Sequence, residues 1–256
     1  MGIIYSNDFI TSLTITPRSE NSSYPAENIE EQWHLPRLFK AEDATANDYL
    51  MVIDMASAKT VAAVFLNHVN FTSVTIQGHA SDSWGSPSFT TTVTISEDDV
   101  VDRYKAFIPL TSFNYRYMRI FIPSGQTPTS DSVWFVGGLE VLDSYTELTR
   151  NPGRLTRTSE LPIETNEIHG RTTDVMELGT LRGWSGSLKF SARKMSNEAE
   201  LWTLNNLSPA TPIVLYENLS DTSRVYLARK ASCYQGAIRP GLIVDGNSID
   251  FEEVGV

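Results

Sequence analysis

Apolar and polar side chains alternate in several short segments of the first 145 residues. Alternation with a period of two is typical of a β-strand that is buried on one face. The clearest segments are also rich in β-branched and aromatic residues, which favour strands; they are Phe71–Gln77, Phe89–Ile95 and Tyr115–Ile122. Turn residues such as Gly85 and Gly125 separate them. We therefore predict a β-sandwich for this part of the chain.

The rest of the chain, residues 146–256, shows the same strand pattern. The predicted strands are Ser187–Ala192, Ile213–Tyr216, Arg224–Arg229 and Ser248–Glu252. Asp245-Gly-Asn247 is a hairpin signal, and it predicts that Leu242–Val244 pairs with Ser248–Phe251. We expect a second β-rich domain here, shaped as a barrel or a sandwich.

One segment of this second part, residues 196–207, has the pattern of a helix. Ser196 is a suitable N-cap, and Leu201, Leu204 and Leu207 fall on one face. Pro209 follows and ends the segment. We therefore predict one α-helix within the second β-rich domain.

The negative charge of the chain is concentrated in its first 145 residues. The chain has 256 residues, with 20 basic and 31 acidic side chains and a net charge of −11. Residues 1–145 carry 8 basic and 17 acidic groups, whereas residues 146–256 carry 12 and 14. The turn signal Asn151-Pro-Gly153 lies just after this shift. We predict two domains, 1–145 and 146–256.

Composition excludes several classes of function. The acidic charge disfavours binding to nucleic acid or to an anionic membrane surface, since both require basic patches. The longest apolar stretches, such as Val61–Leu66, are too short to span a bilayer. A single cysteine, Cys233, permits neither an internal disulfide nor a thiolate zinc cluster, which fits a reducing compartment.

Motifs for catalysis are missing from the sequence. The four histidines lack the i, i+4 spacing of a zinc helix, although His68 and His79 could face each other across a hairpin. There is no glycine-rich nucleotide loop and no Gly-x-Ser-x-Gly elbow. A Ser-His-Asp triad stays open, because its members meet only in space. We assign no catalytic residue, no cofactor and no metal ligand, and we expect no enzyme.

An acidic run, Glu97-Asp-Asp99 with Asp102 nearby, has two interpretations. Its oxygen atoms suit calcium, but the run lacks the order of an EF-hand loop. The preferred interpretation is a solvated acidic loop at the end of a strand.

Aromatic residues near a polar loop are the candidate contact residues. Trp84 lies within the polar segment 81–88, and Phe89 opens the strand that follows. A tryptophan in such a loop either stacks on a sugar or a partner protein, or folds back to cap the core. The remaining tryptophans have apolar neighbours and are predicted to be core residues: Trp33, Trp134, Trp184 and Trp202.

Five motifs in order resemble the discoidin-like (coagulation factor type C) galactose-binding domains. They are Tyr24–Ile29 followed by Trp33, Asp48–Met55, Thr60–Leu66, Tyr115–Ile120 and Gly137–Val141. Met55-Ala56 stands where the family usually has Leu-Gly. The resemblance implies a jelly-roll β-sandwich. It carries over no binding residue, because the family holds its ligands with loops that vary freely.

The second part is similar in its predicted architecture to the hub domain of bacteriophage distal tail proteins, although there the hub comes first. The combination implies a structural component of a phage tail tip or baseplate. Such a protein would form a homo-oligomeric ring, six-fold in preference to three-fold, and would contact the tail tube, hub and tape-measure proteins. It would assemble in the host cytoplasm, reside in the virion and face a host surface glycan.

Two other functions compete with this one. The alternative is a carbohydrate-binding module for a cell-surface polysaccharide, which predicts exposed aromatic residues such as Trp84. A hydrolase acting on host glycans is the third, and it requires a pair of carboxyl groups that nothing in the sequence singles out.

Overall fold

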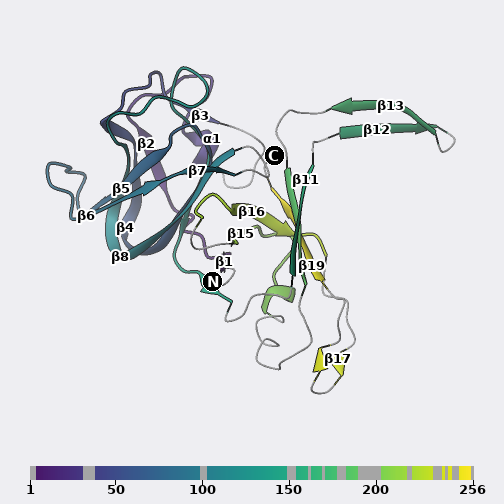
Figure 1. Cartoon of the computed structure of the whole chain (residues 1–256). Helices are drawn as coiled ribbons and strands as arrows, with labels where there is room; N and C mark the ends of the chain where they lie inside the picture. Colours follow the sequence, from purple (N-terminus) through teal and green to yellow (C-terminus); the bar gives the residue numbers. More distant parts are fainter. Residues whose placement is uncertain are drawn as a thin grey trace.

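The described part of the protein is mostly β-structure, built on two large antiparallel sheets (Figure 1). This confirms the predicted fold class. The computed structural model describes residues 4–30, 38–98, 103–148, 154–160, 163–168, 171–177, 183–189, 203–217, 221–232, 238–239, 242–243 and 248–254. Within these residues, no helix has the length and apolar character needed to cross a membrane.

The eight-stranded sheet contains most of the first part of the chain. Its strands run in the order β3-β9-β4-β8-β5-β6, with β2 paired to β4 and β7 paired to β8. Their bounds are β2 (Thr14–Pro17), β3 (Phe39–Lys40), β4 (Asp48–Val69), β5 (Ser73–His79), β6 (Phe89–Thr94), β7 (Ser96–Asp98), β8 (Arg103–Ile122) and β9 (Phe135–Leu142), and one short helix, α1, spans Glu27–Glu30.

Two very long strands, β4 and β8, fold this sheet into a sandwich. The first half of β4 pairs with β2 and with the second half of β8, which in turn pairs with β5. The second half of β4 pairs with β9 and with the first half of β8. The register of the pair shifts between Asp54 and Lys59, where Ala56 has a φ of 60°. Ser112 of β8 has a φ of 63°. We place the corner between the layers here, because shifts of register bend strands.

The core of the sandwich lies between the two layers. It contains aliphatic residues from both layers, together with Phe39, Phe71 and Trp134. The indole N–H of Trp134 donates a 3.0 Å hydrogen bond to the carbonyl of Thr45, so its polar atom is satisfied inside the core. The prediction that Trp134 is a core residue is confirmed. Trp33 and Trp202 lie outside the described residues, as does the side chain of Trp184.

The seven-stranded sheet contains most of the second part of the chain. Its order is β10-β1-β15-β16-β19-β14-β11. The bounds are β1 (Ile4–Ser6), β10 (Thr146–Glu147), β11 (Arg154–Glu160), β14 (Gly183–Lys189), β15 (Ile213–Tyr216), β16 (Val225–Lys230) and β19 (Ser248–Glu253). Strand β1 comes from the start of the chain, yet it pairs with β15 and β10. The division at residue 145 stays a prediction, and β1 lies across it.

Two separate hairpins complete the second part. They are β12 (Ile163–Ile168) with β13 (Arg171–Glu177), and β17 (Ile238–Arg239) with β18 (Leu242–Ile243). The predicted pairing of 242–244 with 248–251 is wrong, because β19 already pairs with β14 on one side and β16 on the other. Residues 203–205 of the predicted helix are helical, and residues 196–202 lie outside the described residues.

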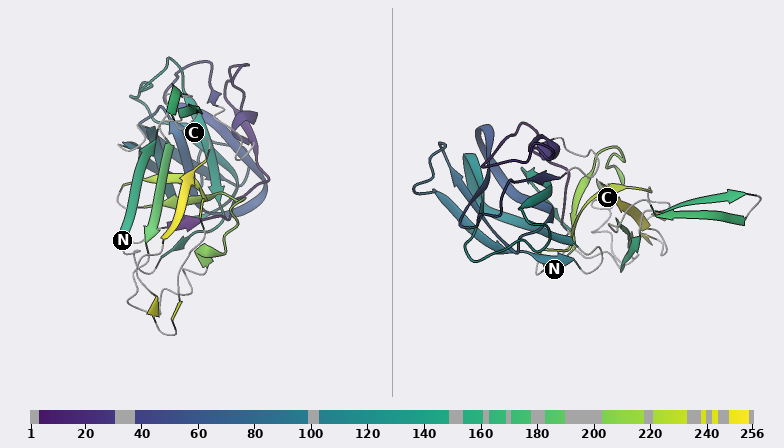
Figure 2. Two further views of the ribbon diagram at one scale, coloured as in Figure 1. Left: turned by 90° about the vertical axis from the view of Figure 1, so that its right-hand side faces the viewer. Right: turned by 90° about the horizontal axis from the view of Figure 1, so that it is seen from above.

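The seven-stranded sheet covers one face of the sandwich (Figure 2). A second apolar cluster joins Phe65, Phe107 and Leu142 of the sandwich to residues of β1, β15 and β16. The ring of Phe107 stacks on the ring of Tyr216, with centroids 4.7 Å apart. The two sheets are therefore packed together through apolar side chains.

A buried ionic cluster lies at this same junction. Lys105 Nζ is 3.1 Å from Asp98 Oδ2, 3.8 Å from Glu253 Oε1 and 3.8 Å from the ring centre of Tyr226. Lys105 and Asp98 belong to the sandwich, whereas Glu253 and Tyr226 belong to the other sheet. The interpretation of the acidic run as a solvated loop is wrong for Asp98, which is fully buried and paired with Lys105, whereas Glu97 is exposed and Asp99 and Asp102 lie outside the described residues.

Candidate functional site

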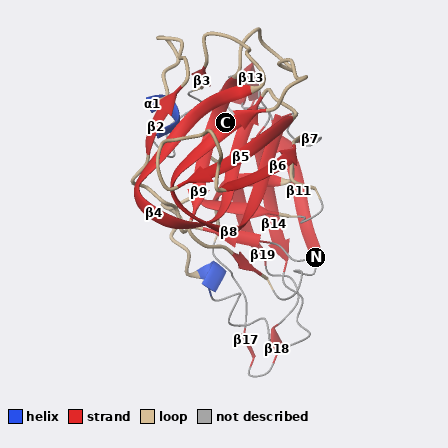
Figure 3. Cartoon of the chain, turned by 90° about the vertical axis from the view of Figure 1, so that its left-hand side faces the viewer, coloured by secondary structure: helices blue, strands red, loops and turns tan. Residues whose placement is uncertain are grey.

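The other face of the sandwich is not covered by the seven-stranded sheet (Figure 3). It is formed by β2, β5, β6 and the paired halves of β4 and β8. Along β8, Met118, Ile120 and Ile122 are buried in the core. Because successive side chains of a strand point to opposite faces, Tyr117, Arg119 and Phe121 point outward.

Neighbouring strands add further side chains to this face. Gln77 and His79 of β5 lie opposite Arg119 and Tyr117 of β8, and Tyr49 of β4 lies opposite Phe121. Trp84 reaches the same face from the β5–β6 loop, because its ring lies 4.7 Å from Arg119 Cζ. We call this set the platform; it consists of Tyr49, Gln77, His79, Trp84, Tyr117, Arg119 and Phe121. All of them are half-buried.

Arg119 is the centre of the platform. Its Cζ atom lies 4.7 Å from the ring centre of Trp84, 5.5 Å from that of Phe121 and 5.8 Å from that of Tyr49. These distances are within the range of cation–π interactions. Its Nε–H donates a 2.7 Å hydrogen bond to Gln77 Oε1, which holds the guanidinium in place among the rings.

The β5–β6 loop is held by short-range hydrogen bonds. His79 Nδ1 contacts the carbonyl oxygen of Ser81 at 2.8 Å and the backbone nitrogen of Ser81 at 3.1 Å. The indole N–H of Trp84 donates a 2.6 Å hydrogen bond to Asp82 Oδ1. The Trp84 ring is therefore fixed from its edge by Asp82 and from its face by Arg119. It belongs to neither apolar cluster, so the alternative in which it caps the core is not what the structure shows.

Two opposing effects act on the pKa of Arg119. Partial burial lowers the pKa of Arg119 from its usual value, because burial disfavours the charged form. The carboxylates of Asp48 and Asp82 act in the opposite direction and favour the charged form. Burial therefore opposes the charge of Arg119, and the two carboxylates support it.

A second arginine borders the platform. Arg116 donates hydrogen bonds of 2.8 Å and 2.7 Å to the two carboxylate oxygens of Asp54, and its Cζ lies 4.9 Å from the ring centre of Tyr117. This pairing lowers the pKa of Asp54 and raises the pKa of Arg116. Because both oxygens of Asp54 are engaged, the Arg116 guanidinium is already occupied, unlike that of Arg119.

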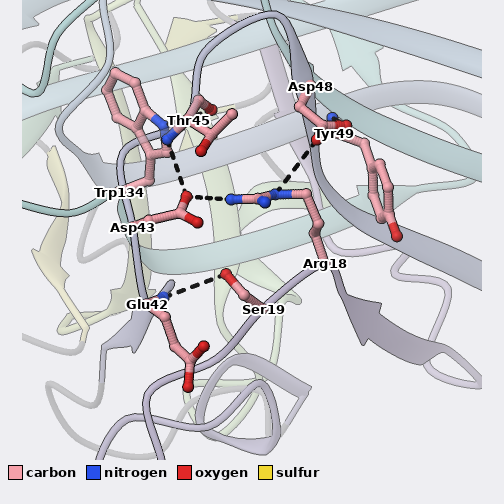
Figure 4. A network of polar contacts seen from close by, with 8 residues as sticks. All are labelled: Arg18, Ser19, Glu42, Asp43, Thr45, Asp48, Tyr49 and Trp134. Atoms are coloured by element: carbon pink, nitrogen blue, oxygen red, sulfur yellow. Dashed lines mark hydrogen bonds and ion pairs between the residues drawn. The ribbon is translucent and has the colours of Figure 1, made fainter.

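A polar network secures the chain that leads into Tyr49 (Figure 4). Arg18 lies between Asp43, with which it forms an ion pair, and Asp48, whose Oδ2 is 3.7 Å from Arg18 Nε. The backbone N–H of Thr45 donates a 2.9 Å hydrogen bond to Asp43, and this bond is the largest of the effects that lower the pKa of Asp43. These contacts attach the 41–48 loop to the end of β2 and thereby position Tyr49.

The platform provides stacking surfaces and hydrogen-bonding groups, but no set of metal ligands. In the part of the chain that the structure describes, no cluster of His, Cys, Asp or Glu could hold a metal ion. The two histidines suggested as partners are not brought together: the ring of His68 packs against the edge of Phe135, whereas His79 holds the β5–β6 loop. The arrangement is suited to binding a ligand that offers flat faces and hydroxyl groups.

The structure places the two predicted contact residues differently. Trp84 lies on the platform, whereas Phe89 packs against Phe113, with ring centroids 5.2 Å apart, at the border of the core. Contact of either with a ligand stays a prediction. The residues that sequence reasoning missed are Tyr49, Gln77, Tyr117, Arg119 and Phe121. The sequence signal that could have identified three of them is the row of large side chains at the alternate positions 117, 119 and 121 of one strand.

Comparisons with known proteins give similarity only at the level of structure. No protein-family model matches the chain, and no curated protein matches it. Among solved structures, the chain is similar to a chitosan-binding module of a chitosanase/glucanase from Paenibacillus sp. IK-5, with 22% identity, a TM-score of 0.38, and coverage of 52% of this chain and 97% of that one.

Two further similar structures each cover 54% of this chain. The lectin-binding domain of lectinolysin, in complex with Lewis b, has 12% identity, a TM-score of 0.40, and coverage of 54% of this chain and 96% of that one. SpGH29 has 10% identity and a TM-score of 0.39, with coverage of 54% of this chain. The chain spans only 28% of the length of SpGH29. The TM-scores all lie below 0.5, so the assignment of the fold rests on the strand pairing itself.

Proposed function

We propose that this protein is a carbohydrate-binding module and that the platform is its binding surface. The observation that carries the proposal is the position of Arg119. It lies on the uncovered face of the sandwich, with the rings of Trp84, Phe121 and Tyr49 within 6 Å and a side-chain amide holding its Nε.

The chemistry of this surface suits a sugar better than an apolar partner. A sugar ring has apolar C–H faces that pack on aromatic side chains, and a rim of hydroxyl groups that need donors and acceptors. The platform offers both within one patch, because the rings alternate with Gln77, His79 and Arg119. A purely hydrophobic partner would leave these polar groups desolvated and unpaired, which costs binding free energy.

The test is a glycan array probed with the full chain. We expect binding to a restricted set of glycans, and a loss of at least about tenfold in affinity for Trp84→Ala and Tyr49→Ala. Tyr24→Ala is the matched control, because Tyr24 is an exposed aromatic residue outside the platform, with Lys40 Nζ 4.6 Å from its ring centre. Binding that survives both platform substitutions, or no binding at all, contradicts the proposal.

A second candidate function is a structural component of a phage tail tip, assembled as a ring in the host cytoplasm and carried in the virion. The β12–β13 hairpin favours it: within the described residues it pairs with no other strand, and it projects from the seven-stranded sheet (Figures 1 and 2). A lone hairpin is marginally stable in water, so a partner would supply its missing contacts.

Light scattering on the purified chain tests this second function. A ring of six or three copies that falls apart when residues 163–177 are replaced by a short Gly-Ser linker would support it. A monomer at high concentration contradicts it. We expect neither candidate to be accompanied by catalysis or by a cofactor.

A further inference from the structure

We infer that the platform selects neutral, hydroxyl-rich glycans over glycans that carry carboxylate or sulfate groups. The inference rests on the proposed function and adds the chemical class of the ligand. An arginine at the centre of a binding surface usually points to an anionic ligand. The groups around Arg119 give the opposite expectation.

The first step is the donor capacity of Arg119. A guanidinium has five N–H donors in a fixed fork. Gln77 accepts from Nε, and among the described residues no hydrogen-bond partner is found for the Nη groups. Arg119 is half-buried, so those N–H groups are available to a ligand oxygen.

The second step is the acceptor capacity beside it. Asp48 and Asp82 both interact electrostatically with Arg119 and favour its charged form. Asp48 accepts from Tyr49 N–H and lies 3.7 Å from Arg18 Nε, and Asp82 accepts from Trp84 N–H. Each carboxylate keeps lone pairs beyond these contacts, because an ionised carboxylate has about four acceptor sites. A sugar hydroxyl both donates and accepts, so it satisfies such an arginine–aspartate arrangement from both sides. A ligand carboxylate can only accept, and it would lie close to these aspartates.

The third step is the charge of the surface. Among the described residues, the groups that the ion pairs and interactions above connect to the platform are three cations and four anions: Arg18, Arg116 and Arg119 against Asp43, Asp48, Asp54 and Asp82. The chain as a whole carries −11. An anionic polymer is therefore repelled at long range, and near Arg119 it also meets the negative charges of Asp48 and Asp82. A cationic amino-sugar polymer gains from the net charge but meets Arg119 at the centre of the surface.

The experiment sorts the array of glycans by charge. The full chain is applied to neutral glycans, to uronic-acid, sialylated and sulfated glycans, and to amino-sugar polymers, each at low and at high salt. We expect neutral glycans to dominate, and their affinity to change less than about twofold with salt, because no counterions are released. Preferential binding to acidic or amino-sugar glycans overturns the inference and leaves the proposed function standing. No binding to any class overturns the proposed function itself.

The role of Arg119 has its own matched pair of variants. Arg119→Lys keeps the charge but loses the fork, and we expect it to weaken binding of the best neutral glycan at least about tenfold. Arg116→Lys, on the same strand, is the control and should stay within about twofold, because Asp54 occupies that guanidinium. Gln77→Leu, which releases Arg119 Nε, should weaken binding as well and guards against a folding defect in one variant. Unchanged affinity in both Arg119→Lys and Gln77→Leu contradicts the inference.

Discussion

The two halves of strand β8 face different surroundings, although both belong to one continuous strand. In the first half, the outward residue Phe107 is buried under the seven-stranded sheet against Tyr216. In the second half, the outward residues Tyr117, Arg119 and Phe121 stay half-buried and form the platform. In the covered half, the outward residues Lys105 and Phe107 are both fully buried, whereas the outward residues of the open half are half-buried rings and hydrogen-bonding groups. The two halves thus differ in what covers them rather than in composition: the seven-stranded sheet supplies partners for both Lys105 and Phe107, and it does not cover Arg119.

The largest effect is expected where a covered aromatic residue is compared with an open one. Phe107→Ala should lower the free energy of unfolding by about 4 kcal/mol, because it leaves a cavity between the two sheets. Phe121→Ala on the same strand should cost only about 1 kcal/mol, since its ring is already half exposed. Urea denaturation of the two variants measures the difference. Similar losses would show that the two faces do not differ as described.

The next effect separates a buried ion pair from a surface one. Lys105→Met leaves Asp98 and Glu253 buried without their cation, and it should cost about 3 kcal/mol. Lys40→Met removes a comparable pair with Asp131 near the surface, where the cost should be below about 1 kcal/mol. Thermal and urea unfolding report both values. A small effect of Lys105→Met would mean that the junction is open to water.

The covered junction should also set the alkaline limit of stability. Burial raises the pKa of Tyr216 from 10.0 to about 12, and Asp221 adds to the shift. The raised value means that the folded state holds the proton more tightly. The stabilisation is complete below pH 10 and is lost as the pH rises towards 12, by roughly 2 kcal/mol. Unfolding midpoints from pH 8 to 12 should fall for the native chain and fall less for Tyr216→Phe.

A smaller gain is expected at the corner where β4 passes from the open half to the covered half. Ala56 has a φ of 60°, a left-handed backbone that glycine adopts without the steric cost of a side chain. Ala56→Gly should therefore stabilise the fold by about 0.5 kcal/mol after the entropy lost with glycine is subtracted. Asn47→Gly, also at positive φ, is less informative, because asparagine tolerates this conformation. Destabilisation by Ala56→Gly would contradict the strained corner.

The smallest expected effect is on the stability of the fold in acid, and it concerns Asp43 of the 41–48 loop. The N–H of Thr45 and the charge of Arg18 lower the pKa of Asp43 below its usual value of 3.8. A lowered pKa means that the unfolded state binds the proton more readily, so the stabilisation is present above pH 3.8 and is lost as the pH falls below it. Asp43→Asn should flatten this part of the stability profile between pH 5 and 2.5. An unchanged profile would show that the loop contacts of Asp43 do not contribute.

The sequence by itself determined many of the local elements and the mostly-β fold class. Alternation in Phe71–Gln77 and Tyr115–Ile122 predicted strands that the structure contains, because period-two patterns report directly which side chains are buried. The five family-like motifs predicted a sandwich in the first part, and Met55-Ala56 marked a position whose left-handed backbone explains the usual glycine. Trp84 was singled out because the polarity of its loop is a local property.

Only the tertiary structure decided which face of that sandwich stays open. Arg119, Gln77 and Tyr49 are separated by tens of residues and become neighbours only through the pairing of β4, β8 and β5. Asp98 looked like part of a solvated run because the other sheet, which brings Glu253 and Tyr226 against its partner Lys105, comes from a distant part of the chain. The β18–β19 hairpin failed for the same reason, since long-range neighbours had taken both edges of β19. Local patterns report burial along one strand, whereas a site or a junction depends on contacts between distant strands.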